Sequence, residues 1–147
     1  MNTPSDCLPV ILDTPNIVFH NQHRGIKQIE NNFLAILNLL IHPLVIFVII
    51  TPKILKFFQR ETLFVTQIIN QNNGHIIYSE DQDPDIVVLD LALKLGAPII
   101  TNDKFRQPEY DNYTKIKHRV IRFDIVSTSI IPKNDYWKNY LGVGESD

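Results

Sequence analysis

Cysteine is nearly absent from this sequence of 147 residues. Cys7 is the single one, so the chain can form neither an internal disulfide bond nor a zinc site built on several cysteines. The opening stretch MNTPSDCLP also lacks the basic and apolar regions of a secretory signal peptide. We therefore expect an intracellular protein, located in a reducing compartment such as the cytoplasm or the nucleus.

Glycine-rich phosphate loops are missing as well. The five glycines are scattered, and neither G-x-G-x-x-G nor G-x-x-x-x-G-K occurs, which disfavours dinucleotide and ATP binding. No serine nucleophile motif is present either. The net charge of −2 gives no general attraction to nucleic acid. A polyanionic partner would need a local basic surface or bound metal cations.

One apolar stretch, FLAILNLLIHPLVIFVII at residues 33–50, approaches the length of a membrane-spanning helix. Asn38, His42 and Pro43 interrupt it, and its first half continues a helical pattern that begins at Ile26. Its second half is rich in β-branched residues, which suit a buried strand. We expect two adjacent core elements here and no membrane partner.

What the sequence does contain is an alternation of short apolar strands with amphipathic helices. We predict strands at residues 8–13, 44–50, 75–79, 98–101 and 119–126. Helices are predicted at 26–40 and from Thr51-Pro52 onward. A third helix is favoured over a strand at 84–95, because Asp83-Pro84 is a typical helix start and Gly96 a typical helix end.

This alternation predicts a three-layer αβα fold, doubly wound around a mostly parallel five-stranded sheet. We expect one domain over residues 1–147, with a core at about 8–127. Residues 128–147 are polar and aromatic, and we expect them to form a tail across the surface.

Acidic residues fall at the carboxyl ends of several predicted strands. Asp13 ends the first strand, Asp103 follows the fourth, and Asp83 and Asp85 open the helix after the third. Open α/β sheets bind their ligands at this edge, so we expect the carboxylates to converge there. Clustered carboxylates repel one another unless a cation joins them, and oxygen ligands favour Mg²⁺ or Mn²⁺. Such a site can activate water for attack on phosphorus.

Each acid also has a purely structural interpretation. Asp83 is expected to cap the helix rather than to bind metal, Asp85 could merely complement the helix dipole, and Asp103 could belong to an ordinary Asn-Asp turn. Asp124 lies within the last predicted strand, where we expect it to pair with a neighbouring arginine rather than to supply a further acid. The spacing of His20 and His23 is a weak zinc pattern, and we expect both to be solvated.

Four segments, read in order, resemble a known family: VILDTPNI, RGIKQIENNF, LVIFVIITPK and DPDIVVLDLALKLGAPIITNDKFR. Together they are similar to the PIN-like NYN ribonuclease domain of the regnase type, a group of endoribonucleases that often precede a CCCH zinc finger. The resemblance runs from about Val10 to Tyr136. It implies a PIN-like fold and a metal-dependent endoribonuclease.

The resemblance also implies roles for single residues. Asp13, Asp85 and Asp103 match the catalytic, metal-binding aspartates, Asn16 matches the asparagine that supports the first of them, and Asp83 is a further candidate ligand. Two features depart from the family pattern: Pro84-Asp85 replaces a pair of adjacent acids, and Pro15 stands at a position that is usually small. The cysteines of a CCCH finger are absent.

Basic residues near the predicted edge could hold the backbone of an RNA substrate. The candidates for RNA binding are Arg24, Lys53, Lys104 and Arg106, with Lys56 and Arg60 on the same predicted helix as Lys53. Aromatic residues available for base stacking are Tyr78, Phe105 and Tyr110. The resemblance also allows a homodimer, to which Tyr136 and Trp137 could contribute, and further domains of a longer protein.

Three hypotheses about function remain open from the sequence. The first is an endoribonuclease that cleaves single-stranded RNA by water attack at an Mg²⁺ (or Mn²⁺) site. The second, prompted by the altered acidic pair, is a PIN-like fold that acts as an RNA- or protein-binding module without catalysis. The third is a different Mg²⁺-dependent phosphotransfer or receiver-like domain, because many functions share this architecture.

Overall fold

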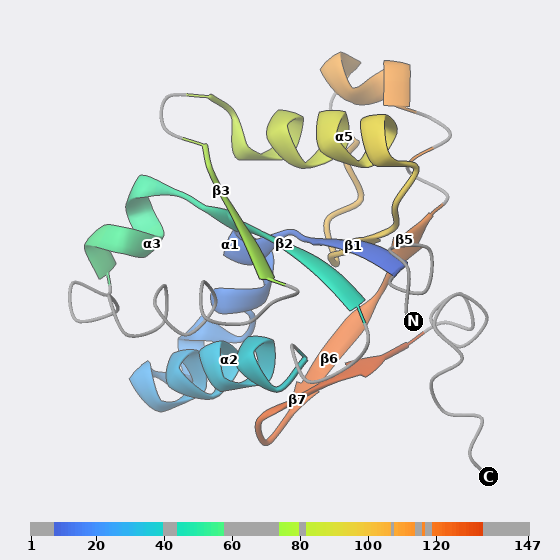
Figure 1. The fold of residues 1–147 in the computed structure, drawn as a ribbon. Coiled ribbons are helices and arrows are strands. Elements are labelled where there is room, and N and C mark those ends of the chain that lie inside the picture. The colour runs from blue at the N-terminus through green and yellow to red at the C-terminus, as the bar shows by residue number, and fades with distance from the viewer. Residues whose placement is uncertain are drawn as a thin grey trace, which may run out of the picture.

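A computed structural model describes residues 8–39, 44–57, 74–79, 82–106, 108–113, 116 and 119–133. Its centre is a five-stranded sheet (Figure 1) in the order β3-β2-β1-β4-β5. The strands are β1 (Leu8–Leu12), β2 (Leu44–Ile50), β3 (Gly74–Tyr78), β4 (Ile99–Ile100) and β5 (Val120–Ile121). Every pairing within this sheet is parallel, so the predicted α/β architecture with a parallel five-stranded sheet is confirmed.

The central strands β2, β1 and β4 are apolar, as expected for strands that are covered on both faces of the sheet. Val10 and Leu12 point into a core shared with α1 (Thr14–Val18) and α2 (Ile26–Leu39), whereas Ile11 between them points into a second core beneath α5 (Pro84–Leu95). In Figure 1, α5 lies on one side of the sheet and α1 and α2 lie on the other. These are the three layers that the sequence predicts.

The two helices that begin at proline start as predicted. The Thr51 hydroxyl accepts the Ile54 backbone N–H at 3.2 Å, which caps α3 (Pro52–Phe57). The Asp83 side chain caps α5, and Gly96 ends that helix in the left-handed conformation at φ 65°. The structure adds the short helix α1, which has too few residues to show a hydrophobic period in the sequence.

The predicted strand at 119–126 is wrong in one respect, since it breaks at Arg122. β5 stays in the sheet, whereas β6 (Phe123–Val126) leaves it and pairs with β7 (Ser129–Pro132) in an antiparallel hairpin. The break has a physical cause in the Asn102 side chain. Its Nδ2 donates to the Phe123 carbonyl at 2.9 Å, and its Oδ1 accepts the Phe123 N–H at 3.0 Å. The backbone groups of Phe123 are therefore bonded to this side chain and not to a neighbouring strand.

Residues 129–132 were expected in a surface tail and instead form β7. Ile130 packs against the core that α2 covers, and the Asn38 side chain donates to the Thr128 carbonyl at 2.7 Å. Residues 134–147, with Tyr136 and Trp137, lie outside the described part of the chain.

The apolar stretch at 33–50 divides between α2 and β2, as predicted. Within the described ranges, the structure contains no helix with the length and apolar character needed to cross a bilayer.

Candidate metal centre

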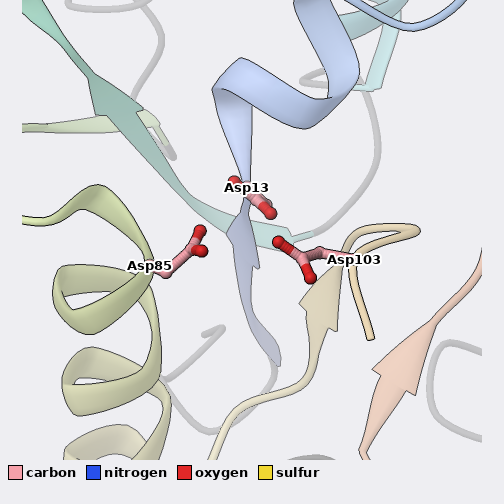
Figure 2. Close-up of side chains that lie close together, drawn as sticks. All are labelled: Asp13, Asp85 and Asp103. Atoms are coloured by element: carbon pink, nitrogen blue, oxygen red, sulfur yellow. The ribbon is translucent and has the colours of Figure 1, made fainter. Parts of the chain in front are cut away.

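Three aspartates meet at the carboxyl edge of the sheet. Figure 2 shows their side chains pointing toward one another: Asp13 from the end of β1, Asp85 from the first turn of α5 and Asp103 from the loop after β4. Each offers one carboxylate oxygen, and these oxygens lie within 4.8 Å of one another. The convergence predicted from the sequence is confirmed.

Asp13 is fixed by the pairing of β1 with β4. Leu12 lies opposite Ile100, so Asp13 falls beside Thr101, and its N–H donates to the Ile100 carbonyl at 3.1 Å. The Thr101 hydroxyl donates to the Asp13 carboxylate at 2.7 Å and accepts the Asp103 N–H at 3.0 Å. Asp13 is only 3% exposed and Thr101 is fully buried. One threonine therefore orients both acids.

Asp103 is held by the shape of its own loop. Its carboxylate accepts the Phe105 N–H at 2.8 Å, and Phe105 itself has a positive φ of 49°. The half-buried Arg122 donates from Nη1 to the carbonyls of Asp103 and Thr101, at 2.6 and 3.3 Å. These contacts fix the loop in the conformation in which the Asp103 carboxylate points toward Asp13 and Asp85 (Figure 2).

Asn16 makes a different contact from the one that the family resemblance implies. Its side-chain oxygen accepts the Asn102 backbone N–H at 2.8 Å, so it ties helix α1 to the loop that carries Asp103. Its backbone amide is the part that acts on Asp13, because it lowers the pKa of that carboxyl.

Asp83 lies beside the cluster and is not one of its three members. Its carboxylate accepts the Asp85 N–H at 3.0 Å as the cap of α5 and accepts the Tyr110 hydroxyl at 2.9 Å. The same hydroxyl lies 3.2 Å from the Asp85 carboxylate. The expected capping role of Asp83 is confirmed.

Burial, together with repulsion between the acids, makes ionisation of Asp13 and Asp85 costly. The pKa of Asp13 is raised from 3.8 to about 7, mainly by burial and also by the charges of Asp85 and Asp103, while the hydrogen bond from Thr101 acts in the opposite direction. Burial also raises the pKa of Asp85 from 3.8 to about 6, with added contributions from Asp103 and Asp83. A divalent cation would relieve this repulsion, and the all-oxygen donor set fits a hard cation.

The basic residues predicted to bind RNA lie on several different elements. Arg24 lies in the short 3₁₀ helix Gln22–Arg24 and is exposed, as are Lys104 and Arg106 in the loop after Asp103. Lys53 opens α3, and its Nζ lies 4.5 Å from the centre of the Phe19 ring. Arg60 and the side chain of Lys56 lie outside what the structure describes.

Two expectations about neighbouring side chains are wrong. Phe105 and Tyr110 are 1% and 3% exposed, so their rings are unavailable for base stacking, whereas Tyr78 is 50% exposed. They are buried because both pack in the core beneath α5. Asp124 pairs with His20 at 3.0 Å instead of with an arginine, because the β6–β7 hairpin places it against the turn after α1.

Sequence reasoning missed three supporting residues: Thr101, Tyr110 and Arg122. Arg122 has one local signal, because it interrupts the apolar residues Val120-Ile121 and Phe123. Thr101 and Tyr110 carry no comparable signal, since threonine is common in strands and tyrosine in cores.

The sheet order β3-β2-β1-β4-β5 belongs to an α/β domain with a PIN-like fold. A crystal structure of nuclear proteinaceous RNase P 2 (PRORP2) from A. thaliana aligns with 88% of this chain at a TM-score of 0.63 and 19% sequence identity. Another structure of the Arabidopsis thaliana nuclear protein-only RNase P 2 aligns with 87% of it, at 0.60 and 18%. The chain spans about 30% of the length of each of those proteins. No family model matches the sequence, and no curated protein matches it.

Proposed function

We propose that this domain is a metal-dependent endoribonuclease of the regnase type that cleaves single-stranded RNA. The observation that carries the proposal is the meeting of Asp13, Asp85 and Asp103 within 4.8 Å at the carboxyl edge of a PIN-like sheet. The similarity to protein-only RNase P structures supports the nuclease fold. The motifs shared with the regnase type support the finer assignment.

In this proposal the three aspartates hold Mg²⁺ or Mn²⁺ through their carboxylate oxygens. A bound divalent cation supplies an activated water and stabilises charge on the phosphate. Asp13, buried and held by Thr101, provides the most rigid of the three oxygen ligands. The partly exposed Asp85 and Asp103 leave an open side for substrate. Water attack at phosphorus would leave a 5′-phosphate and a 3′-hydroxyl.

The proposal extends to how RNA is held. Arg24, Lys53, Lys104 and Arg106 would contact the phosphates on either side of the scissile bond. A single strand suits an open sheet edge, because one backbone can approach the acids without a second strand in the way. The exposed Tyr78 remains as a stacking surface. The proposal places this activity inside the cell, and it is compatible with a homodimer or with further domains of a longer protein.

The direct test is metal removal. Purified protein is incubated with 5′-labelled single-stranded RNA in Mg²⁺ or Mn²⁺, and in parallel with EDTA. We expect cleavage with metal, none in chelator, and products that carry 5′-phosphate ends. Cleavage that persists in EDTA would overturn the proposal, and RNA binding without cleavage would favour the non-catalytic binding module.

The raised pKa values predict how metal binding depends on pH. Protons compete with the cation for Asp13, whose pKa is about 7, and for Asp85, whose pKa is about 6. Mn²⁺ affinity should be nearly constant above pH 8, fall about tenfold per unit just below pH 7, and fall more steeply below pH 6. Calorimetric titration across this range measures it. A Mn²⁺ affinity that stays constant from pH 8 to pH 5.5 would contradict the raised pKa values of Asp13 and Asp85.

A further inference from the structure

Tyr110 contacts Asp85, a member of the acidic cluster, and its neighbour Asp83. Its hydroxyl is 2.9 Å from the Asp83 carboxylate and 3.2 Å from Oδ2 of Asp85. The residue is only 3% exposed and packs with Val88 and Leu89 in the core beneath α5. A ring fixed in a packed core holds its hydroxyl at a fixed point, so the contact with Asp85 is built into the fold.

The hydroxyl acts as a donor to these acids. An ionised carboxylate offers only acceptor oxygens, so the Tyr110 hydroxyl supplies the proton in these contacts. The Asp83 carboxylate is already oriented by the cap of α5. Contact at Oδ2 of Asp85 restrains the orientation of that side chain.

The same aromatic unit reaches the second partly exposed acid. The Phe105 ring packs edge-on against the Tyr110 ring, with centroids 6.0 Å apart and an interplanar angle of 85°. The Phe105 N–H donates to the Asp103 carboxylate at 2.8 Å. Asp85 and Asp103 come from different elements. The buried pair of Phe105 and Tyr110 connects them, because Tyr110 contacts Asp85 and Phe105 contacts Asp103.

We infer that Tyr110 is a positioning residue that orients Asp85 for metal binding. Through its packing against Phe105, it also fixes the position of Asp85 relative to Asp103. This inference rests on the proposed metal-dependent function. Groups that orient metal ligands typically contribute a factor of about 10 to 100 in metal affinity. A ligand set that is ordered before the ion arrives loses less conformational freedom on binding.

Tyr110→Phe tests the inference, because it removes the hydroxyl and retains the ring. The matched control is Tyr113→Phe. Tyr113 lies on the same 3₁₀ helix (Pro108–Tyr113), and its hydroxyl donates to Asp90 on the exposed side of α5. Tyr110→Phe removes the contacts of one hydroxyl with Asp83 and Asp85, whereas Tyr113→Phe removes the contact of one hydroxyl with Asp90, so only the first variant acts on the cluster.

Mn²⁺ binding is measured by the electron paramagnetic resonance signal of the free ion, together with thermal unfolding in EDTA. We expect Tyr110→Phe to bind Mn²⁺ about tenfold more weakly and Tyr113→Phe to bind it like the wild type. The Mn²⁺ concentration for half-maximal cleavage should rise by the same factor in Tyr110→Phe, while turnover recovers at saturating Mn²⁺. A purely structural role would lower turnover without moving the metal requirement.

Wild-type Mn²⁺ affinity in Tyr110→Phe would overturn this inference and leave the proposed function standing. An equal loss in Tyr113→Phe would also overturn it, because the effect would then come from the attachment of the 3₁₀ helix. Absence of Mn²⁺ binding by the wild-type protein would overturn the proposed metal site and this inference together.

Discussion

Replacing Asp85 with asparagine is expected to reduce metal-dependent RNA cleavage by about 10²–10³-fold, the loss that follows removal of one group that stabilises a transition state. Asparagine preserves the size of the side chain and an oxygen acceptor for the Tyr110 hydroxyl, so the fold should be kept. What it removes is one of the three negative charges that would hold the cation. Cleavage rates under excess enzyme, at saturating Mg²⁺, measure the effect.

Asp90→Asn is the matched control for this experiment. Asp90 lies on the same helix, α5, and is exposed, and it accepts the Tyr113 hydroxyl away from the cluster. It should therefore cleave RNA at close to the wild-type rate. If the two variants lost activity equally, the loss would come from removing a negative charge anywhere on α5. The assignment of Asp85 as a metal ligand would then be wrong.

Much of the fold follows from local sequence signals. The strand at 44–50 is seven apolar residues in a row, and helix α5 begins at Asp-Pro and ends at glycine, so each boundary is set by neighbouring residues. The end of β5 is different. It depends on the Asn102 side chain meeting the Phe123 backbone 21 residues away, and no local pattern announces a contact of that kind.

The residues of the site also fall into two groups, those that local sequence signals predict and those that depend on distant contacts. Asp13, Asp85 and Asp103 could be predicted because each follows a strand or opens a helix, and parallel topology brings those positions to one edge. The groups that orient them could not. Thr101 reaches Asp13 across 88 residues of sequence and Tyr110 reaches Asp85 across 25, through pairings that exist only after folding. Topology can therefore predict which acids meet, while the side chains that orient them stay hidden until the chain is folded.

Asp13→Asn is expected to make the metal-free protein more stable while it abolishes metal-dependent cleavage. The pKa of Asp13 is 3.8 in the unfolded chain and about 7 in the fold, so the folded state binds the proton more tightly. Stability from the protonated carboxyl is fully present below pH 3.8 and is lost as the pH rises through 7. Above that range the buried charge costs about 4 kcal/mol, which neutral asparagine avoids.

The stabilising effect of Asp13→Asn should therefore grow by about 2–3 kcal/mol between pH 5 and pH 8, when both proteins are unfolded with urea in EDTA. Saturating Mg²⁺ should reverse much of the difference, because a cation at a hundred times its dissociation constant stabilises the wild type by about 2.7 kcal/mol and has lost a ligand in the variant. Asp124→Asn serves as the control of opposite sign. The hydrogen bond from His20 lowers the pKa of Asp124, so its removal should bring no gain at pH 8. An Asp13→Asn protein no more stable than the wild type at pH 8 in EDTA would show that the buried carboxylate carries no electrostatic cost, and the need for a cation at this edge would lose its physical basis.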